Sequence, residues 1–145
     1  MKTETDALKD LYTTLIDSRE GYAEAAEAVD SNHLQSMFTD LSNRRAQDAV
    51  ELRSFLAGTG VEIDDDGSLL GTAHRSFVDL KERVMGDDAS VVEEVLRGEQ
   101  HLLDAYDRAI EPMTANSEAY NFATKHYRAL SDRLDALKAE KRKAA

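Results

Sequence analysis

The chain has 145 residues, 29 acidic and 18 basic, with a formal net charge of −11 at pH 7. This length suits one ordinary domain that buries roughly 68–70% of its unfolded surface, so we expect a single domain over residues 1–145. The acidic balance argues against nucleic acid and anionic membranes as partners, because it repels phosphate groups, and the absence of cysteine excludes disulfides, thiolate metal sites and cysteine nucleophiles.

The apolar residues recur at helical spacing, and the chain contains a single proline, so we predict that it is nearly all helix. The first predicted helix runs from about Asp6 to Asp30. The second follows the turn near "VDSNH" and ends at the glycines of "LAGTG". After the acidic loop "VEIDDDGS" a shorter helix is expected over about 69–85. These boundaries define the first half of a helical bundle.

Two further long helices complete the chain. Asp87 or Asp88 is the predicted N-cap of a helix that runs from about Ser90 to Glu111. The last predicted helix follows "MTANSEAY" and continues to about Lys141. The chain therefore predicts four long helices and one shorter helix between the second and third of them.

The long connection between the second and third long helices indicates the topology. A simple up-and-down bundle needs only short loops, whereas a helix over about 69–85 would span roughly 25 Å and could return the chain along the bundle. Such a crossover makes the second and third long helices parallel. We therefore predict an all-α, ferritin-like four-helix bundle with a helical crossover at about 69–85.

Polar residues interrupt the apolar stripe of every long helix at a similar depth. Glu99 lies in the middle of the stripe formed by Val92, Val95, Leu96, Leu103, Tyr106 and Ile110. Arg19 lies between Leu15 and Tyr22 on the first helix. The corresponding residues are Arg45 and Asp48 on the second helix and His126 on the last. We therefore predict one buried polar layer composed of Arg19, Arg45, Asp48, Glu99 and His126.

Four stretches, "DSREGYAEAAEAV", "LSNRRAQDAVEL", "GSLLGTAHRSFVDLK" and "VLRGEQHLLDAY", extend over much of the chain. In their spacing the chain resembles an uncharacterised bacterial four-helix-bundle family, a domain of unknown function placed in the ferritin-like superfamily. The superfamily implies a di-metal centre in the middle of the bundle, with one Glu from each of two helices and Glu-x-x-His from each of the other two.

The chain departs from that ligand pattern. Arg19 takes the place of the first-helix Glu, and "RAQD", which ends at Asp48, stands where Glu-x-x-His is expected. The last helix keeps His126 but has Ala123 in place of the Glu. Only Glu99 and His126 carry over from the pattern that the resemblance implies.

Two interpretations of the polar layer remain open. In the first, the arginines and carboxylates neutralise one another as a buried ion network, with no cofactor. In the second, Asp48, Glu99 and His126 hold one Fe, Mn or Zn ion through two oxygens and one nitrogen. We favour the ion network, because two arginines beside a divalent ion would be costly in a core of low dielectric constant.

The chain carries no Gly-rich phosphate loop, nucleophile elbow or pair of catalytic carboxylates, and we assign no catalytic residue. No stretch approaches the roughly 18 uninterrupted apolar residues of a membrane span, and no signal peptide is recognised, so we expect a cytoplasmic protein. We expect a non-enzymatic interaction module whose partner is another protein or a second copy of the chain, and the family resemblance adds an association with stress. The alternative is a metal-binding protein with redox or metal-handling activity.

Overall fold

The computed structural model describes residues 3–61 and 87–144, and within these ranges the chain forms α-helices and no β-strand. The helices are α1 (Glu4–Ala28), α2 (Asn32–Gly58), α4 (Asp88–Ile110) and α5 (Glu118–Ala144). The prediction of an all-α chain with four long helices is confirmed. None of the helices described is long and apolar enough to cross a membrane.

The helix starts are fixed by side chains that accept hydrogen bonds from free backbone N–H groups. Thr3 and Asp6 form a reciprocal capping box at α1, and Ser31 caps α2 by accepting from the backbone N–H of Leu34. Asp87 is the N-cap of α4. Asp88 instead accepts hydrogen bonds from the backbone of Asp30 and Ser31, at 2.8 and 3.0 Å. The start of α4 is thereby tied to the turn between α1 and α2.

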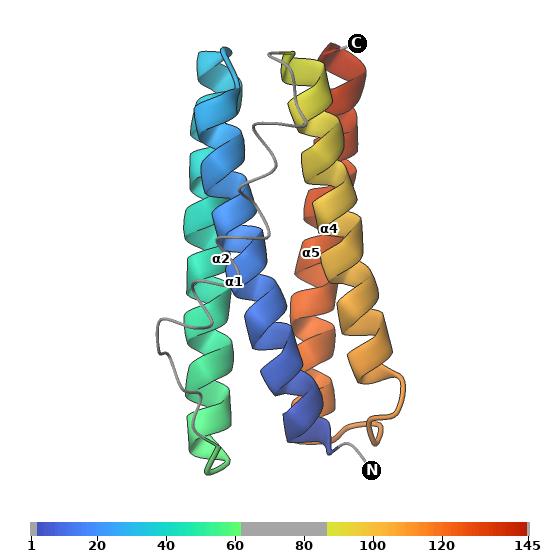
Figure 1. Ribbon diagram of the computed structural model, residues 1–145. Coiled ribbons are helices and arrows are strands. Elements are labelled where there is room, and N and C mark those ends of the chain that lie inside the picture. The colour runs from blue at the N-terminus through green and yellow to red at the C-terminus, as the bar shows by residue number, and fades with distance from the viewer. Residues whose placement is uncertain (1–2, 62–86, 145) are drawn as a thin grey trace.

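The helices form a bundle in which α1 packs beside both α2 and α4, and α5 packs beside α4 (Figure 1). From the end of the bundle that holds the N-terminus, α1 and α5 run toward the far end, and α2 and α4 run back. The second and third long helices are therefore parallel, as expected. The predicted crossover helix at about 69–85 lies outside the described residues.

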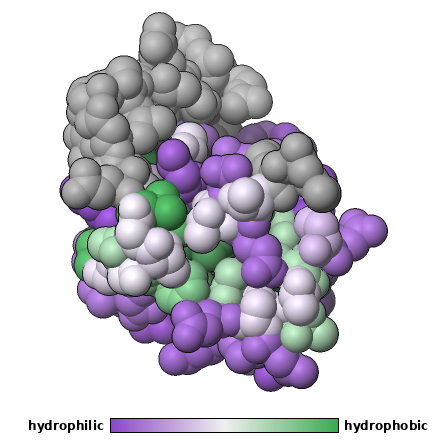
Figure 2. Space-filling view, turned by 90° about the horizontal axis from the view of Figure 1, so that it is seen from below, coloured by the Kyte–Doolittle hydropathy of each residue, from purple (hydrophilic) through white to green (hydrophobic). Residues whose placement is uncertain are grey.

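The apolar core is divided into two clusters along the bundle axis. One is nearer the N-terminal end and is built around leucines of α1, α2, α4 and α5. The other surrounds the turn between α1 and α2 and includes Tyr22, Phe38 and Val92. Seen end-on from below, the bundle has hydrophilic residues around most of its margin, with apolar residues visible between them (Figure 2). Between the two clusters lie the buried charged residues that form the candidate site.

Candidate functional site

The centre of the site is an ion pair between α2 and α4. Arg45 is completely buried, and Glu99 is 4% exposed. The Nη2 atom of Arg45 donates to both carboxylate oxygens of Glu99 at 2.5 Å. In the layer that the sequence predicts, the arginine that neutralises Glu99 is Arg45. A carboxylate therefore lies on the core face of α4 because a buried arginine neutralises it.

The remaining guanidinium nitrogens of Arg45 also have partners. Nε donates to the Ser18 hydroxyl at 3.0 Å, and Nη1 donates to Asp48 at 3.3 Å. The guanidinium carbon lies 5.6 Å from the centre of the Tyr22 ring, within the range of a cation–π contact. Burial by itself lowers the pKa of Arg45, but the combined effects of its neighbours, that of the Glu99 charge first, outweigh burial and raise the pKa. Arg45 is therefore a fixed positive charge.

Asp48 connects the central ion pair to the side of the bundle where α2 faces α5. Its side chain is 5% exposed, and its Oδ2 atom accepts the hydrogen bond from Arg45. Two further arginines approach it at longer range, with Arg44 Nε 3.6 Å from Oδ1 and Arg133 Nη1 3.9 Å from Oδ2. Asp48 is thus surrounded by positive charge contributed by both helices.

His126 completes this side of the site from α5. Its Nδ1 atom lies 4.0 Å from Asp48 Oδ1, and its Nε2 atom lies 3.2 Å from Glu51 Oε2. The imidazole stacks on Phe122, which in turn stacks on Phe55 of α2. Burial lowers the pKa of His126 despite the opposing effect of the two carboxylates, so the imidazole is neutral at pH 7.

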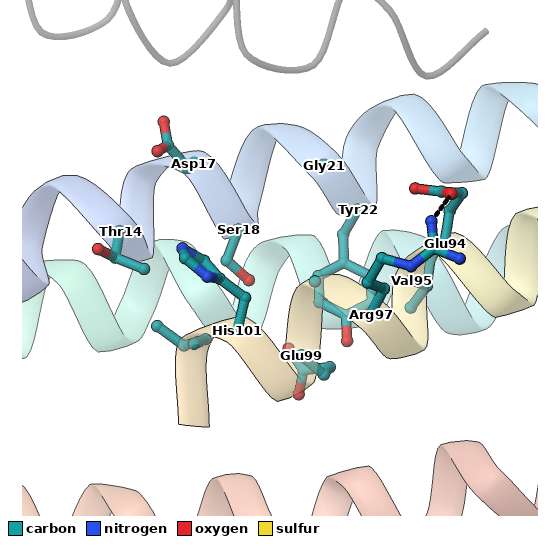
Figure 3. Close-up of a pocket in the computed structure, with 12 residues that line it drawn as sticks. Thr14, Asp17, Ser18, Gly21, Tyr22, Glu94, Val95, Arg97, Glu99 and His101 are labelled. Atoms are coloured by element: carbon teal, nitrogen blue, oxygen red, sulfur yellow. Dashed lines mark hydrogen bonds and ion pairs between the residues drawn. The ribbon is translucent and has the colours of Figure 1, made fainter. Parts of the chain in front are cut away.

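A cavity of about 330 Å³ opens beside the layer, between α1 and α4. Tyr22 and Glu99 line it, and in Figure 3 the Tyr22 ring reaches toward Glu99 while His101 points toward Ser18. Burial and the charge of Glu99 raise the pKa of Tyr22 well above its usual value. Tyr22 therefore stays protonated and can donate its hydroxyl hydrogen toward the layer.

The placement of Arg19 differs from the expected one. Its side chain is 30% exposed and pairs with Glu20 at 2.7 Å, outside the buried layer. Ser18 and Arg19 are neighbours in the sequence interval between Leu15 and Tyr22, and it is Ser18 that faces inward, where its hydroxyl accepts a hydrogen bond from Arg45 of α2. The other four expected residues, Arg45, Asp48, Glu99 and His126, are all buried.

The site also contains residues that were not anticipated, among them Ser18, Arg44, Glu51 and Arg133. Glu51 follows Asp48 by three positions, so both carboxylates lie on one face of α2. This spacing is the sequence feature from which Glu51 could have been predicted as part of the site. Arg133 is half-buried on α5, where its pKa is lowered by burial and by Arg44 and Arg45. Nothing in its sequence context distinguishes it from an exposed arginine.

The residues present do not fit the di-metal centre that the family resemblance implies. Arg45 is a buried cation at the centre of the layer, and it holds both oxygens of Glu99. For the same reason the expected trio of Asp48, Glu99 and His126 does not form a free ligand set. The metal-ligating atoms that do come together belong to Asp48, Glu51 and His126, and all lie within 4.8 Å of one another.

The hydroxyl of Tyr106 is buried and has no hydrogen-bond partner among the described residues. An unsatisfied buried polar group costs about 1–3 kcal/mol, so Tyr106→Phe is expected to raise the free energy of unfolding by about 1 kcal/mol. The midpoint of urea unfolding should increase with an unchanged slope. The matched control is Tyr127→Phe, whose partly exposed hydroxyl donates to Asp107 and should give no gain. A destabilised Tyr106→Phe variant would show that the hydroxyl has a partner.

The depressed pKa of His126 predicts how stability changes with pH. Because the pKa of His126 in the folded protein lies below its ordinary value of 6.5, the unfolded chain binds the proton more readily. The contribution of neutral His126 to stability is therefore complete above about pH 6.5 and is lost as the pH falls through the folded pKa. In unfolding measurements at a series of pH values, His126→Gln should remove this part of the acid destabilisation. Identical pH dependence in the two proteins would contradict the assignment.

A family model described as a domain of unknown function matches residues 3–112, which is most of the chain. No curated protein and no solved structure gives a significant match. The site must therefore be interpreted from its own geometry and charge.

Proposed function

The chain belongs to the DUF2383 family of domains of unknown function, and we propose that it is a non-catalytic, ferritin-like four-helix bundle with a buried ionic layer in place of a di-metal centre. Its proposed role is that of an interaction module in the bacterial cytoplasm, with an association with stress that rests on the family resemblance. A protein partner or a second copy of the chain is the proposed binding partner.

One observation carries the proposal, and it is the position of Arg45. A guanidinium with no solvent exposure, hydrogen-bonded to both oxygens of Glu99, supplies the positive charge that metal ions supply in a di-metal protein. Redox chemistry on such a bundle requires open coordination positions at a metal. Arg45 leaves no such position at Glu99, which supports a structural role for the layer.

The ferritin-like assignment is supported by the direction of the helices. In Figure 1, α1 and α2 are antiparallel, α4 and α5 are antiparallel, and α2 and α4 are parallel. A bundle with one long crossover connection has this arrangement.

The proposed class of partner follows from charge. A formal net charge of −11 favours association with basic protein surfaces and opposes binding to nucleic acid or to anionic membranes. Association of this kind weakens as salt screens the charges. A second copy of the chain would instead have to bind through a surface where its like charges do not face one another.

Metal analysis tests the proposal directly. Protein purified without added metal is expected to contain fewer than about two Fe, Mn or Zn ions per chain after dialysis, and to show no oxygen-dependent oxidation of Fe(II). Glu99→Ala should leave the metal content unchanged, because Glu99 is held by Arg45. Two ions per chain that resist dialysis and disappear in Glu99→Ala would overturn the proposal in favour of a di-metal protein.

A further inference from the structure

We propose that Asp48, Glu51 and His126 form a site for a single divalent transition-metal ion on the side of the bundle between α2 and α5. This site goes beyond the proposed function and does not depend on it, since neither Glu99 nor the centre of the layer takes part. The ion would be held by two carboxylate oxygens and one imidazole nitrogen.

The geometry places three ligands of suitable type within reach of one ion. Asp48 and Glu51 project from the same face of α2, and His126 faces them from α5, with all ligand atoms within 4.8 Å of one another. Metal–ligand bonds of about 2.0–2.2 Å need donor atoms at a somewhat closer spacing. Glu51 is 44% exposed and is free to make this adjustment by rotating its side chain.

The charges around the site leave room for a cation. The charge of Arg45 is balanced by Glu99, at 2.5 Å. Arg44 and Arg133 lie 3.6 and 3.9 Å from Asp48, beyond normal hydrogen-bond distance, and their side chains are 50% and 24% exposed. Both can turn toward solvent, and the cation that stays in place is Arg45, which donates to Asp48 Oδ2 and leaves Oδ1 to bind a metal ion.

His126 is prepared for metal binding in two respects. The stack of Phe55, Phe122 and His126 fixes the orientation of the ring, so that little rotational freedom remains to be lost on binding. Its Nε2 atom also lies 3.2 Å from Glu51 Oε2, so the ring already faces one of the two carboxylates.

The unpartnered hydroxyl of Tyr106 is an independent sign that a polar ligand belongs here. Tyr106 is 1% exposed, and its hydroxyl makes no hydrogen bond within the described part of the chain. Tyr106 belongs to the same core cluster as Ala49 and Leu52, the residues that directly follow Asp48 and Glu51 on α2. A water molecule on the bound metal would give this hydroxyl the partner that it lacks.

The ligand types determine which metal is expected. Imidazole with carboxylate is suited to Zn²⁺, Fe²⁺ and Mn²⁺, whereas Mg²⁺ and Ca²⁺ prefer sites made wholly of oxygen. Zn²⁺ accepts three protein ligands and a water molecule in a four-coordinate site. We therefore use Zn²⁺ as the thermodynamic probe and Co²⁺ as its spectroscopic substitute.

Calorimetric titration of the metal-free full chain with Zn²⁺ is expected to give about one ion per chain, with Glu51→Gln and His126→Gln each weakening binding by about tenfold or more. His33→Gln is the matched control, because His33 forms another interhelical histidine–carboxylate pair, with Glu140, far from this site along α2. It should bind Zn²⁺ as wild type does. Co²⁺ should give visible absorption bands that the His126 variant loses.

A second variant distinguishes a metal site from a purely structural ion network. Arg44→Gln removes a competing cation near Asp48 and should tighten Zn²⁺ binding, an effect that a merely structural role would not produce. Circular dichroism should show that each variant folds, since Glu51 and Arg44 are well exposed. Absence of Zn²⁺ binding, or binding that His126→Gln leaves unchanged, would overturn the site. A different result would overturn the proposed function, namely two tightly bound ions per chain in the wild type that Glu99→Ala loses.

Discussion

Glu99→Ala is expected to lower the free energy of unfolding by about 3–5 kcal/mol. The substitution leaves the guanidinium of Arg45 with no exposure to solvent and without the carboxylate that accepts two of its hydrogen bonds. Arginine cannot lose its proton to escape this burial, and Asp48, at 3.3 Å, is the carboxylate that it keeps, so the loss of its closer partner carries a large cost. Urea unfolding at equilibrium measures the loss, with Glu93→Ala on the exposed face of α4 as the control.

Two measurements show whether that loss of stability comes from the ion pair or from a bound metal ion: unfolding with a chelator, and unfolding of a variant in which both partners are replaced. The effect of Glu99→Ala should be the same with and without chelator, because the lost partner is an arginine. Replacing both partners, as Arg45→Met with Glu99→Leu, should restore most of the stability, since apolar residues of similar volume often substitute for a buried ion pair. If chelation lowered the melting temperature of wild type to that of Glu99→Ala, the ion-network interpretation would be wrong.

Arg45→Met is expected to destabilise the protein by about 3–5 kcal/mol at about pH 7.5, and the loss should shrink toward about pH 5. This variant leaves Glu99 buried without its partner, and a carboxylate can escape by taking up a proton and becoming neutral. A group that is protonated more readily in the folded state than in the unfolded state gives relatively greater stability at low pH. The two partners of one ion pair thus differ in how their loss depends on pH.

Unfolding curves of wild type, Arg45→Met and Glu99→Ala over this pH range test the difference. Lys9→Met on α1 serves as the control for the loss of an exposed positive charge. A deficit in Arg45→Met that stays constant with pH would mean that Glu99 finds another cation, such as Arg133, when Arg45 is absent.

The helices and most of the buried layer could be predicted because they depend on local spacing. A 3.6-residue period places Glu99 and Arg45 on core faces, and capping residues place the helix starts within a few positions. The long connection between α2 and α4 indicated that these helices are parallel. These features follow from the chain alone because each helix must bury its own apolar face.

The details of the site could not be predicted, because they depend on neighbouring helices. Spacing cannot decide between Ser18 and Arg19, which lie next to each other between Leu15 and Tyr22, and the inward residue is the one whose hydroxyl accepts a hydrogen bond from Arg45 of α2. Likewise Glu51 is an exposed residue on its own helix and joins the site only because α5 brings His126 to 3.2 Å from it. Pairing across helices is tertiary information that helical periodicity does not contain.

The division of the core into two apolar clusters has a consequence for how the helices are aligned along the bundle. Leucine and valine side chains would pack almost as well if α4 slid by one turn, about 5.4 Å, against α2. The same slide would carry the Glu99 carboxylate away from Arg45 and into an apolar cluster. Each misaligned bundle would then hold Glu99 without its buried partner and Arg45 with only Asp48 of its own helix, so the ion pair selects a single register among many of similar apolar contact.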